Sequence, residues 1–300
     1  MRILITGATG LIGTEIVKQC HNQNIDVNYL TTSKSKLSNA DHYKGFLWNP
    51  SKNEIDEECL KDVEAIIHLV GASISKRWTE AYKKTIVLSR ILTSQLLFNT
   101  LKNTAHQVKH IVSASAIGIY PHSLTNYYTE DFNKVSTSFL GQVVKQWEQA
   151  VNAFSVLDIA VSKIRIGLVL SSKGGALPEM AKPIKFGAGA AFGSGKQWQS
   201  WIHVQDLSSL FLHVLTNRLE GIYNGVAPNP ETNKELTKAI AKQLKRPLIL
   251  PNIPRFAMRL VLGEMHILLF ESQRVSSKKI EDTGFHFKHY NVQSALEEEY

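Results

Sequence analysis

Three glycines near the N-terminus constrain the fold of this chain more than any other feature. Residues 3–5 are a β-forming Ile-Leu-Ile run, Gly7, Gly10 and Gly13 follow, and an apolar helical pattern starts at Leu11. A strand, a glycine turn and a helix N-terminus in this order suit a dinucleotide pyrophosphate, because the free N–H groups of the helix attract the anion. The G-x-x-G-x-x-G spacing is also compatible with an ordinary strand-to-helix loop, so the rest of the chain has to support the assignment.

Apolar strands alternate with helical patterns as far as Leu168. We expect strands at 3–6, 26–30, 65–70, 110–113 and 162–166, and helices at about 11–21, 80–101 and 139–154. Near-continuous apolar strands between helices indicate a parallel sheet covered on both faces. The sequence therefore predicts the α/β class, with a Rossmann doubly wound parallel sheet. The segment around Phe46-Leu47-Trp48 receives no assignment.

The composition changes after Leu168, where glycine and then proline become frequent. Helical patterns recur at about 233–244, 254–262 and 292–300. We expect residues 1–168 to form the dinucleotide-binding domain, with later segments returning to its sheet. Residues 169–300 are expected to form a substrate or lid region and a smaller C-terminal helical lobe.

Composition narrows the class of protein. The chain has 300 residues, a net charge of +8 and two cysteines, Cys20 and Cys59, which fit a reducing, cytoplasmic compartment better than a disulfide framework. The basic residues are scattered as pairs, so we expect anionic ligands rather than nucleic acid. No signal peptide and no membrane-spanning run are expected. The histidine pairs at 106/110 and 286/289 lack a third ligand, so no metal site is expected.

The residues after the second strand indicate which dinucleotide binds. An acidic side chain there accepts a hydrogen bond from the ribose of NAD, whereas basic and hydroxyl groups suit the 2′-phosphate of NADP. Thr32, Ser33 and Lys34 occupy this position, and it holds no carboxylate. The sequence favours NADP(H), although a polar loop without a role has the same composition.

Several motifs along the whole chain resemble one family. They are Thr6-Gly7-Ala8-Thr9-Gly10-Leu11-Ile12-Gly13, His68-Leu69-Val70-Gly71-Ala72, Arg77-Trp78-Thr79, Ser89-Arg90, the run from Gly195 to Asp206 that contains Trp201-Ile202-His203, Gly263-Glu264, and Glu271-Ser272-Gln273-Arg274-Val275. Together they resemble the atypical extended short-chain dehydrogenases/reductases called epimerase family proteins, a branch related to the human family 39U. The resemblance implies an NADP-binding Rossmann domain and a short C-terminal domain. It implies cofactor contacts at Gly7, Thr9, Gly10, Leu11, Ile12, Gly13, Thr32, Ser33, Lys34, Leu69, Val70, Gly71, Ala72 and Ser113.

The chain departs from the usual catalytic pattern of that superfamily. A Tyr-x-x-x-Lys pair normally transfers the proton and holds the nicotinamide ribose. With Glu148 as the anchor, Leu140 and Val144 stand at the two positions, and Lys145 is offset by one residue. Leucine cannot transfer a proton, so the standard ketone/alcohol mechanism is in doubt.

Other side chains are candidates for the missing roles. Ser115 is expected to orient a substrate oxygen or to cap the strand end. Tyr120 and His203 are candidate proton donors, although Tyr120 also fits a core aromatic and His203 a structural bridge with Asp206. Candidate substrate residues are Arg165, Lys196 and Trp198. Arg165 equally suits an ion pair with a neighbouring carboxylate, and the Gly187–Trp201 segment fits either a lid or a rigid loop.

Two functions from different classes follow. The first is an NADP(H)-dependent oxidoreductase or epimerase-like enzyme that acts on a small polar, sugar-like substrate. The second is a non-catalytic NADP(H)-binding sensor. A role in cell division, which a label on some relatives suggests, has no support in these residues. The expected partner is a small molecule, and a homodimer is common in the superfamily.

Overall fold

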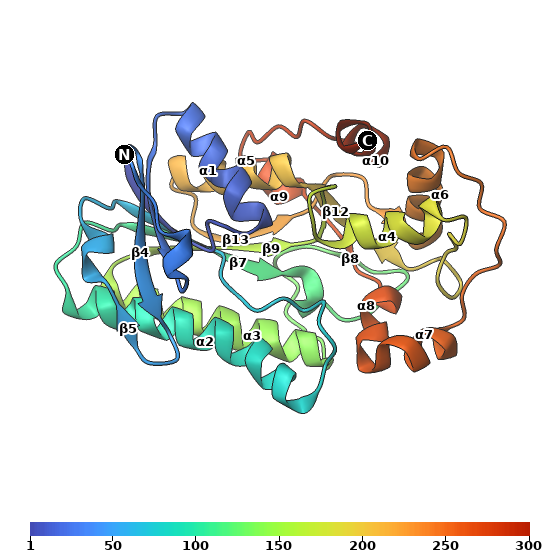
Figure 1. The fold of residues 1–300 in the computed structure, drawn as a ribbon, viewed down its shortest axis with the longest axis horizontal. Helices are drawn as coiled ribbons and strands as arrows, with labels where there is room; N and C mark the ends of the chain where they lie inside the picture. Colours follow the sequence, from blue (N-terminus) through green and yellow to red (C-terminus); the bar gives the residue numbers. More distant parts are fainter.

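Strands from both halves of the chain build the central sheet (Figure 1). The computed structural model describes residues 1–300. The strands of the sheet are β1 (Arg2–Thr6), β2 (Asp26–Thr31), β3 (Asn39–Ala40), β4 (Tyr43–Asn49), β5 (Glu54–Ile55), β6 (Ala65–His68), β7 (His110–Ala116), β9 (Ala160–Ile166) and β13 (Gly221–Gly225). Their order is β13-β9-β7-β6-β1-β2-β4-β3, with β5 paired to β4. All neighbours are parallel except β3 and β5, which pair antiparallel with β4.

The strand order reverses beside β1. The chain builds outward from β1 through β2 to β4, then returns to place β6 on the other side of β1. In open parallel sheets the ligand crevice lies at this switch point, outside the carboxyl ends of the strands. The predicted fold class is confirmed, and the crevice falls between the loops that follow β1 and β6.

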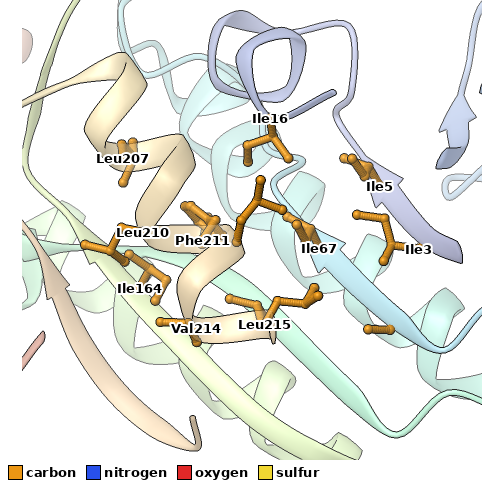
Figure 2. Close-up of a cluster of buried hydrophobic side chains, with 14 of the residues drawn as sticks. Ile3, Ile5, Ile16, Ile67, Ile164, Leu207, Leu210, Phe211, Val214 and Leu215 are labelled. Carbon is orange, nitrogen blue, oxygen red and sulfur yellow. The ribbon is translucent and has the colours of Figure 1, made fainter. Parts of the chain in front are cut away.

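Helices cover both faces of the sheet, and the strand residues alternate accordingly. Ile3, Ile5 and Ile67 face the layer of α1 (Leu11–Asn22) and α5 (Val204–Thr216), where they form one core with α5 residues such as Phe211 (Figure 2). Leu4 faces the opposite core, with Leu97 of α2 (Glu80–Asn103). The helix α3 (Phe139–Asn152) packs beside α2 on that second face.

The remaining elements form a smaller lobe at the C-terminal edge of the sheet (Figure 1). Its helices are α4 (Ala176–Lys185), α6 (Asn233–Gln243), α7 (Arg255–Leu262), α8 (Ile267–Phe270) and α10 (Val292–Glu299), whereas α9 (Lys278–Glu281) packs against β13 of the central sheet. Three two-stranded sheets pair β10 (Leu168–Leu170) with β12 (Trp201–His203), β11 (Trp198–Gln199) with β14 (Glu231–Thr232), and β8 (Tyr127–Tyr128) with β15 (Arg274–Val275). The helices α4, α6 and α10 share a separate apolar core.

Three of the elements that the sequence left unassigned pack with the central sheet or its helices. Residues 43–49 form β4 beside β2, residues 204–216 form α5 against α1, and residues 221–225 form β13 at the sheet edge. The division at Leu168 stays a prediction, although α5 and β13 pack with the sheet. No helix has the length and apolar character needed to cross a membrane.

Candidate functional site

The glycine loop after β1 is tightly folded. Gly7 adopts φ 78°, and the Gly10 N–H donates to the Gly7 carbonyl at 3.0 Å. A Cβ on Gly13 would stand 2.2 Å from the Gly7 oxygen and 2.7 Å from the Ala8 Cα. Gly10 begins α1 without a side-chain cap, and the first turn holds no acidic residue. The loop therefore leaves backbone N–H groups and the positive end of the helix available to a phosphate.

A buried hydrogen-bond chain fixes the loop after β6 against the glycine loop. The Thr6 Oγ1 accepts from the N–H groups of Leu69 and Val70 at 3.1 and 3.4 Å, so its own proton goes to His68 Nδ1 at 2.8 Å. The His68 Nε2 then donates to Ser94 Oγ at 3.2 Å. Complete burial lowers the pKa of His68 to about 4, so the imidazole is neutral at physiological pH. This series of hydrogen bonds fixes the loop after β1 and the loop after β6 relative to each other.

The tip of β2 presents hydroxyl and ammonium groups beside the glycine loop. Thr32 and Lys34 are exposed there, with Ser33 Oγ 2.9 Å from Ser35 Oγ. The residue that reaches the loop is Lys36, whose Nζ donates to Thr9 Oγ1 at 3.4 Å. The predicted cofactor contacts end at Lys34 and do not include Lys36, although both lysines belong to one Ser/Lys run whose short 3₁₀ turn brings Lys36 back toward Thr9.

The far side of the crevice is formed by the residues after β6. Leu69 and Val70 are half-buried, and Gly71 is exposed. The Ala72 N–H donates to Ser89 Oγ of α2 at 2.9 Å, which anchors this segment. Ser113, the remaining predicted cofactor residue, is completely buried, and its hydroxyl donates to the Ala114 carbonyl. Its side chain is therefore turned into the protein rather than toward the loop.

The structure brings Ser115, Tyr120 and Arg165 together around Glu148 of α3. The Ser115 hydroxyl donates to Glu148 Oε1 at 2.6 Å, and Arg165 forms a two-pronged pair with the same carboxylate at 2.9 and 3.0 Å. Arg165 also donates to the Tyr120 hydroxyl, which donates to Asn224. This geometry favours the ion-pair alternative for Arg165 and the core-aromatic alternative for Tyr120.

Electrostatics support an internal network at this position. Burial would raise the pKa of the Glu148 carboxyl, but the hydrogen bonds and charge of Arg165 outweigh burial and lower it. Burial also raises the pKa of the Tyr120 hydroxyl, which is only 1% exposed. A cavity of about 220 Å³ borders Tyr120, Glu148 and Arg165, and reaches Asn152 at the C-terminal end of α3. It lies between the second half of α3 and the residues that follow β7.

The α3 face that would carry a tyrosine and a lysine is apolar. Leu140 packs near Trp78 and Met265, and Val144 is buried against Tyr120 and Val275. Lys145 is exposed on another face of the helix. On β7, Ser115 faces Glu148, and its successor Ala116, which points to the opposite side of the strand, has no hydroxyl.

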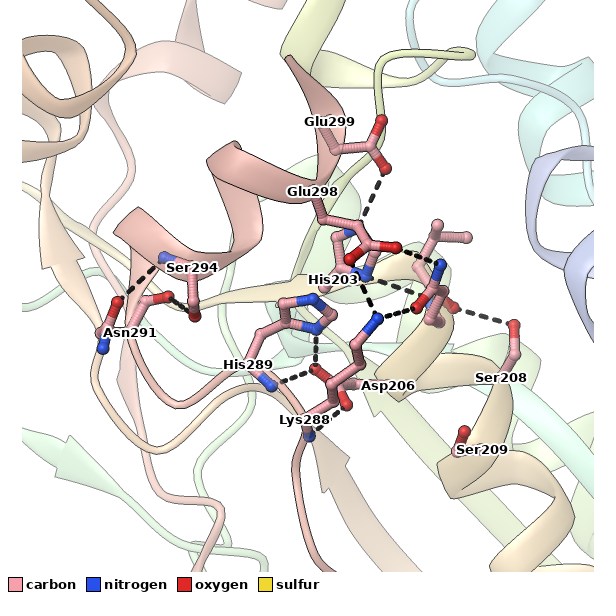
Figure 3. A network of polar contacts seen from close by, with 12 residues as sticks. His203, Asp206, Ser208, Ser209, Lys288, His289, Asn291, Ser294, Glu298 and Glu299 are labelled. Carbon is pink, nitrogen blue, oxygen red and sulfur yellow. Dashed lines mark hydrogen bonds and ion pairs between the residues drawn. The ribbon is translucent and has the colours of Figure 1, made fainter. Parts of the chain in front are cut away.

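His203 is buried in a polar cluster that fastens α10 to the N-terminus of α5 (Figure 3). Its Nδ1 accepts from the Gln205 N–H, and its Nε2 pairs with Glu299 at 2.9 Å. Asp206 accepts from the N–H groups of Lys288 and His289 and from the His289 ring. His203, Asp206 and His289 offer ligand atoms within 4.8 Å of one another, but internal bonds already engage Asp206 and both His203 nitrogens. The arrangement favours the structural bridge over a catalytic His203.

The Gly187–Trp201 segment is bonded into the lobe. Gln197 is buried and donates to the carbonyls of Phe192 and Leu269. The Trp198 indole donates to the Leu124 carbonyl, whereas Lys196 is exposed. These contacts favour a rigid loop over a lid, and the substrate roles of Lys196 and Trp198 stay predictions.

Comparison with known proteins agrees with this geometry. Residues 3–225 match the model of the NAD dependent epimerase/dehydratase family, and residues 253–299 match a domain of unknown function. The chain belongs to the NAD dependent epimerase/dehydratase family. An epimerase family protein of Staphylococcus saprophyticus is 38% identical over 296 residues, which is 98% of each chain. The resemblance stated from the sequence motifs is confirmed.

Solved structures of family members share the whole fold. The human epimerase family protein SDR39U1, crystallised with NADPH, is 28% identical, with a TM-score of 0.85 over 100% of this chain and 99% of that one. A nucleoside-diphosphate sugar epimerase from Corynebacterium glutamicum is 25% identical, with a TM-score of 0.78 over 100% of this chain and 58% of that one. The glycine loop, the crevice and the C-terminal lobe are thus features of an NAD(P)-binding family fold.

Proposed function

We propose that this family member binds NADP(H) in preference to NAD(H) in the crevice between the loops after β1 and β6. The observation that carries the proposal is the tip of β2, where Lys36 reaches Thr9, Thr32 and Lys34 are exposed, Ser33 is half-buried, and no carboxylate is present. A 2′-phosphate would be held by these ammonium and hydroxyl groups. The glycine loop fits the pyrophosphate, because its tight turn, which a side chain at Gly13 would disrupt, leaves the N–H groups at the start of α1 available to the anion.

The test is a fluorescence titration with NADPH and, in parallel, NADH. We expect tighter binding of NADPH, and a loss of roughly tenfold in NADPH affinity alone in Lys36→Met, the size of one charge-assisted contact. Lys52→Met, which removes an exposed lysine elsewhere, is the matched control. Equal affinity of the wild type for both dinucleotides would remove the proposal for the 2′-phosphate.

We propose further that the bound cofactor takes part in an oxidoreductase or epimerase-like reaction on a small polar, sugar-like substrate. NADPH supplies a hydride when it is bound. Leu140 and Val144 present an apolar wall that excludes water but offers no proton. The proton donor therefore lies outside the usual face of α3, on the substrate, on a water molecule or on the lobe.

A non-catalytic sensor is the second candidate, and one observation favours it. The hydroxyls of Ser115 and Tyr120 and both ring nitrogens of His203 are all engaged by internal partners. Hydride exchange at nicotinamide C4 separates the two candidates, followed with NADPH deuterated at both C4 positions and a carbonyl acceptor, or with NADP⁺ and a nucleotide sugar deuterated at the carbon to be oxidised. Deuterium transfer in either direction, or conversion of the sugar to its epimer, supports the enzyme, whereas binding without either supports the sensor. The homodimer stays a prediction that sedimentation would check.

A further inference from the structure

Arg90 of α2 is a half-buried cation without an acidic partner. One terminal nitrogen of its guanidinium donates to the carbonyls of Ala72 and Ile86, at 3.3 and 2.8 Å. No carboxylate perturbs it, and the other two nitrogens have no partner in the structure. Burial lowers the pKa of Arg90 to about 10, so the side chain is still charged at neutral pH. The side chain therefore keeps a positive charge and free donors that an anionic ligand could engage.

The guanidinium borders the crevice. A Cβ on Gly71 would stand 2.9 Å from the Arg90 Cζ, so the absence of a side chain at Gly71 lets the cation approach this exposed segment. The segment adjoins the glycine loop, because a Cβ on Gly7 would meet Leu69 Cβ at 3.3 Å and Val70 N at 3.4 Å. Arg90 is therefore placed within a few residues of the loop proposed for the pyrophosphate.

The place of Arg90 in the sheet topology indicates which half of a bound dinucleotide would lie nearest to it. The adenosine half belongs to β1 and β2, and the second mononucleotide belongs to the half of the sheet that starts with β6. Arg90 lies on α2, the helix that follows β6. The half of the ligand nearest to it is the nicotinamide mononucleotide.

The same conclusion follows from α3. Leu140, Val144 and Trp147 share one helix face at i, i+4 and i+7, and none of them carries a charge. The Arg90 Cζ lies 5.0 Å from the centre of the Trp147 ring, so α2 brings a cation against the helix face that has none of its own.

We propose that Arg90 binds the anionic nicotinamide mononucleotide half of the dinucleotide through the free edge of its guanidinium. This inference rests on the proposed NADP(H) binding. It gives the crevice two cationic contacts, with Lys36 at the adenosine end and Arg90 at the nicotinamide end.

The test compares two ligands that differ in the nicotinamide half. NADPH contains it, whereas 2′,5′-ADP carries only the adenosine and its two phosphates. In Arg90→Met we expect the affinity for NADPH to fall roughly tenfold to a hundredfold, the range of a charge-assisted contact, while 2′,5′-ADP binds as in the wild type. Arg90→Lys keeps the charge on a shorter stem, and it should recover part of the NADPH affinity. Lys102→Met, which removes an exposed cation at the far end of α2, controls for net charge.

The outcomes are distinct. Equal NADPH affinity in the wild type and in Arg90→Met overturns the inference. An equal loss for both ligands in Arg90→Met and Arg90→Lys also overturns it, because it assigns Arg90 to bracing the 71–74 segment. Failure of the wild type to bind either ligand overturns the proposed function instead. Unchanged binding of 2′,5′-ADP shows that the crevice of the variant is folded.

Discussion

Gly13 is the glycine of the loop with the least room for a side chain. A Cβ there would overlap backbone atoms of Gly7 and Ala8, at 2.2 and 2.7 Å, and neither can move without opening the turn. We expect Gly13→Ala to lose NADPH binding and about 1–3 kcal/mol of stability, the usual cost of overpacking. Gly118→Ala is the control, because its nearest contact would be Leu140 Cβ at 3.8 Å. Similar NADPH affinity in both variants would show that the tight turn is not required for binding.

His68 gives the protein an acid-sensitive side chain at the base of the crevice. Burial lowers its pKa to about 4, from the ordinary histidine value of 6.5. As the pH falls from about 6.5 to 4, the unfolded chain takes up a proton that the folded protein excludes. Stability from this group is therefore complete above pH 6.5, and about 3 kcal/mol of it is lost over that interval.

Removing the imidazole should remove this dependence. We expect His68→Gln to flatten the decline in the free energy of unfolding between pH 6.5 and 4, measured by urea denaturation at each pH. His21→Gln, which replaces an exposed histidine of α1, is the comparison variant. An undiminished decline in His68→Gln would mean that other groups dominate the acid response.

At the scale of elements, the predictable parts are those with a local signal. The strand, glycine turn and helix at the N-terminus are visible in thirteen residues, and β1 and α1 match them within a residue. The strand β4 was missed because Lys44 and Gly45 precede its buried Phe46 and Trp48, which leaves only a short apolar run as a strand signal. The helix α5 was missed although Gln205, Ser209 and His213 recur at a spacing of four on its less buried face, so a helical signal was present in the sequence.

The contacts of the site were harder to predict than the elements, because they join residues that are far apart in the sequence. The loop residues follow from glycine chemistry, but the partners of Ser115 and Arg165 depend on Glu148, which lies 33 residues after one and 17 before the other. Sequence patterns do not report contacts over such separations, so a buried ion pair and a substrate anchor have the same signature. Lys36 was within reach, because the Ser/Lys run that contains Lys34 extends to it.

The attachment of α10 to the N-terminus of α5 predicts a loss of stability when Asp206 is removed. Asp206 is buried and accepts two backbone N–H groups and the His289 ring. Asp206→Ala would leave these donors buried without partners, so we expect a loss of about 3 kcal/mol or more in the free energy of urea unfolding. Glu298→Ala breaks only exposed contacts, with Lys288 and with the Gln205 side chain, and should change stability little. Equal losses in the free energy of unfolding in the two variants would contradict the conclusion that buried contacts of Asp206 attach α10 to α5.

At the scale of the whole molecule, the central sheet and the C-terminal lobe meet beside the glycine loop. A cavity of about 300 Å³ is lined by Thr9, Gly10 and Leu11 on one side and by Glu299 of α10 on another. Glu299 also accepts from the Ser172 N–H and pairs with His203. A ligand that orders the loop therefore acts on a wall shared with the last helix of the chain.

This shared wall predicts a pattern of hydrogen exchange. Saturating NADPH should slow amide exchange in residues 8–14, which form the loop, and also in residues 292–300, because both segments border one cavity. Asp206→Ala breaks the attachment of α10 to α5. In this variant NADPH should still slow exchange in the loop, but it should no longer slow exchange in the last helix. Protection confined to residues 8–14 in the wild type would show that the lobe does not sense the cofactor. That result would weaken the sensor as an alternative to the enzyme, since a sensor has to pass the state of its ligand to another part of its surface.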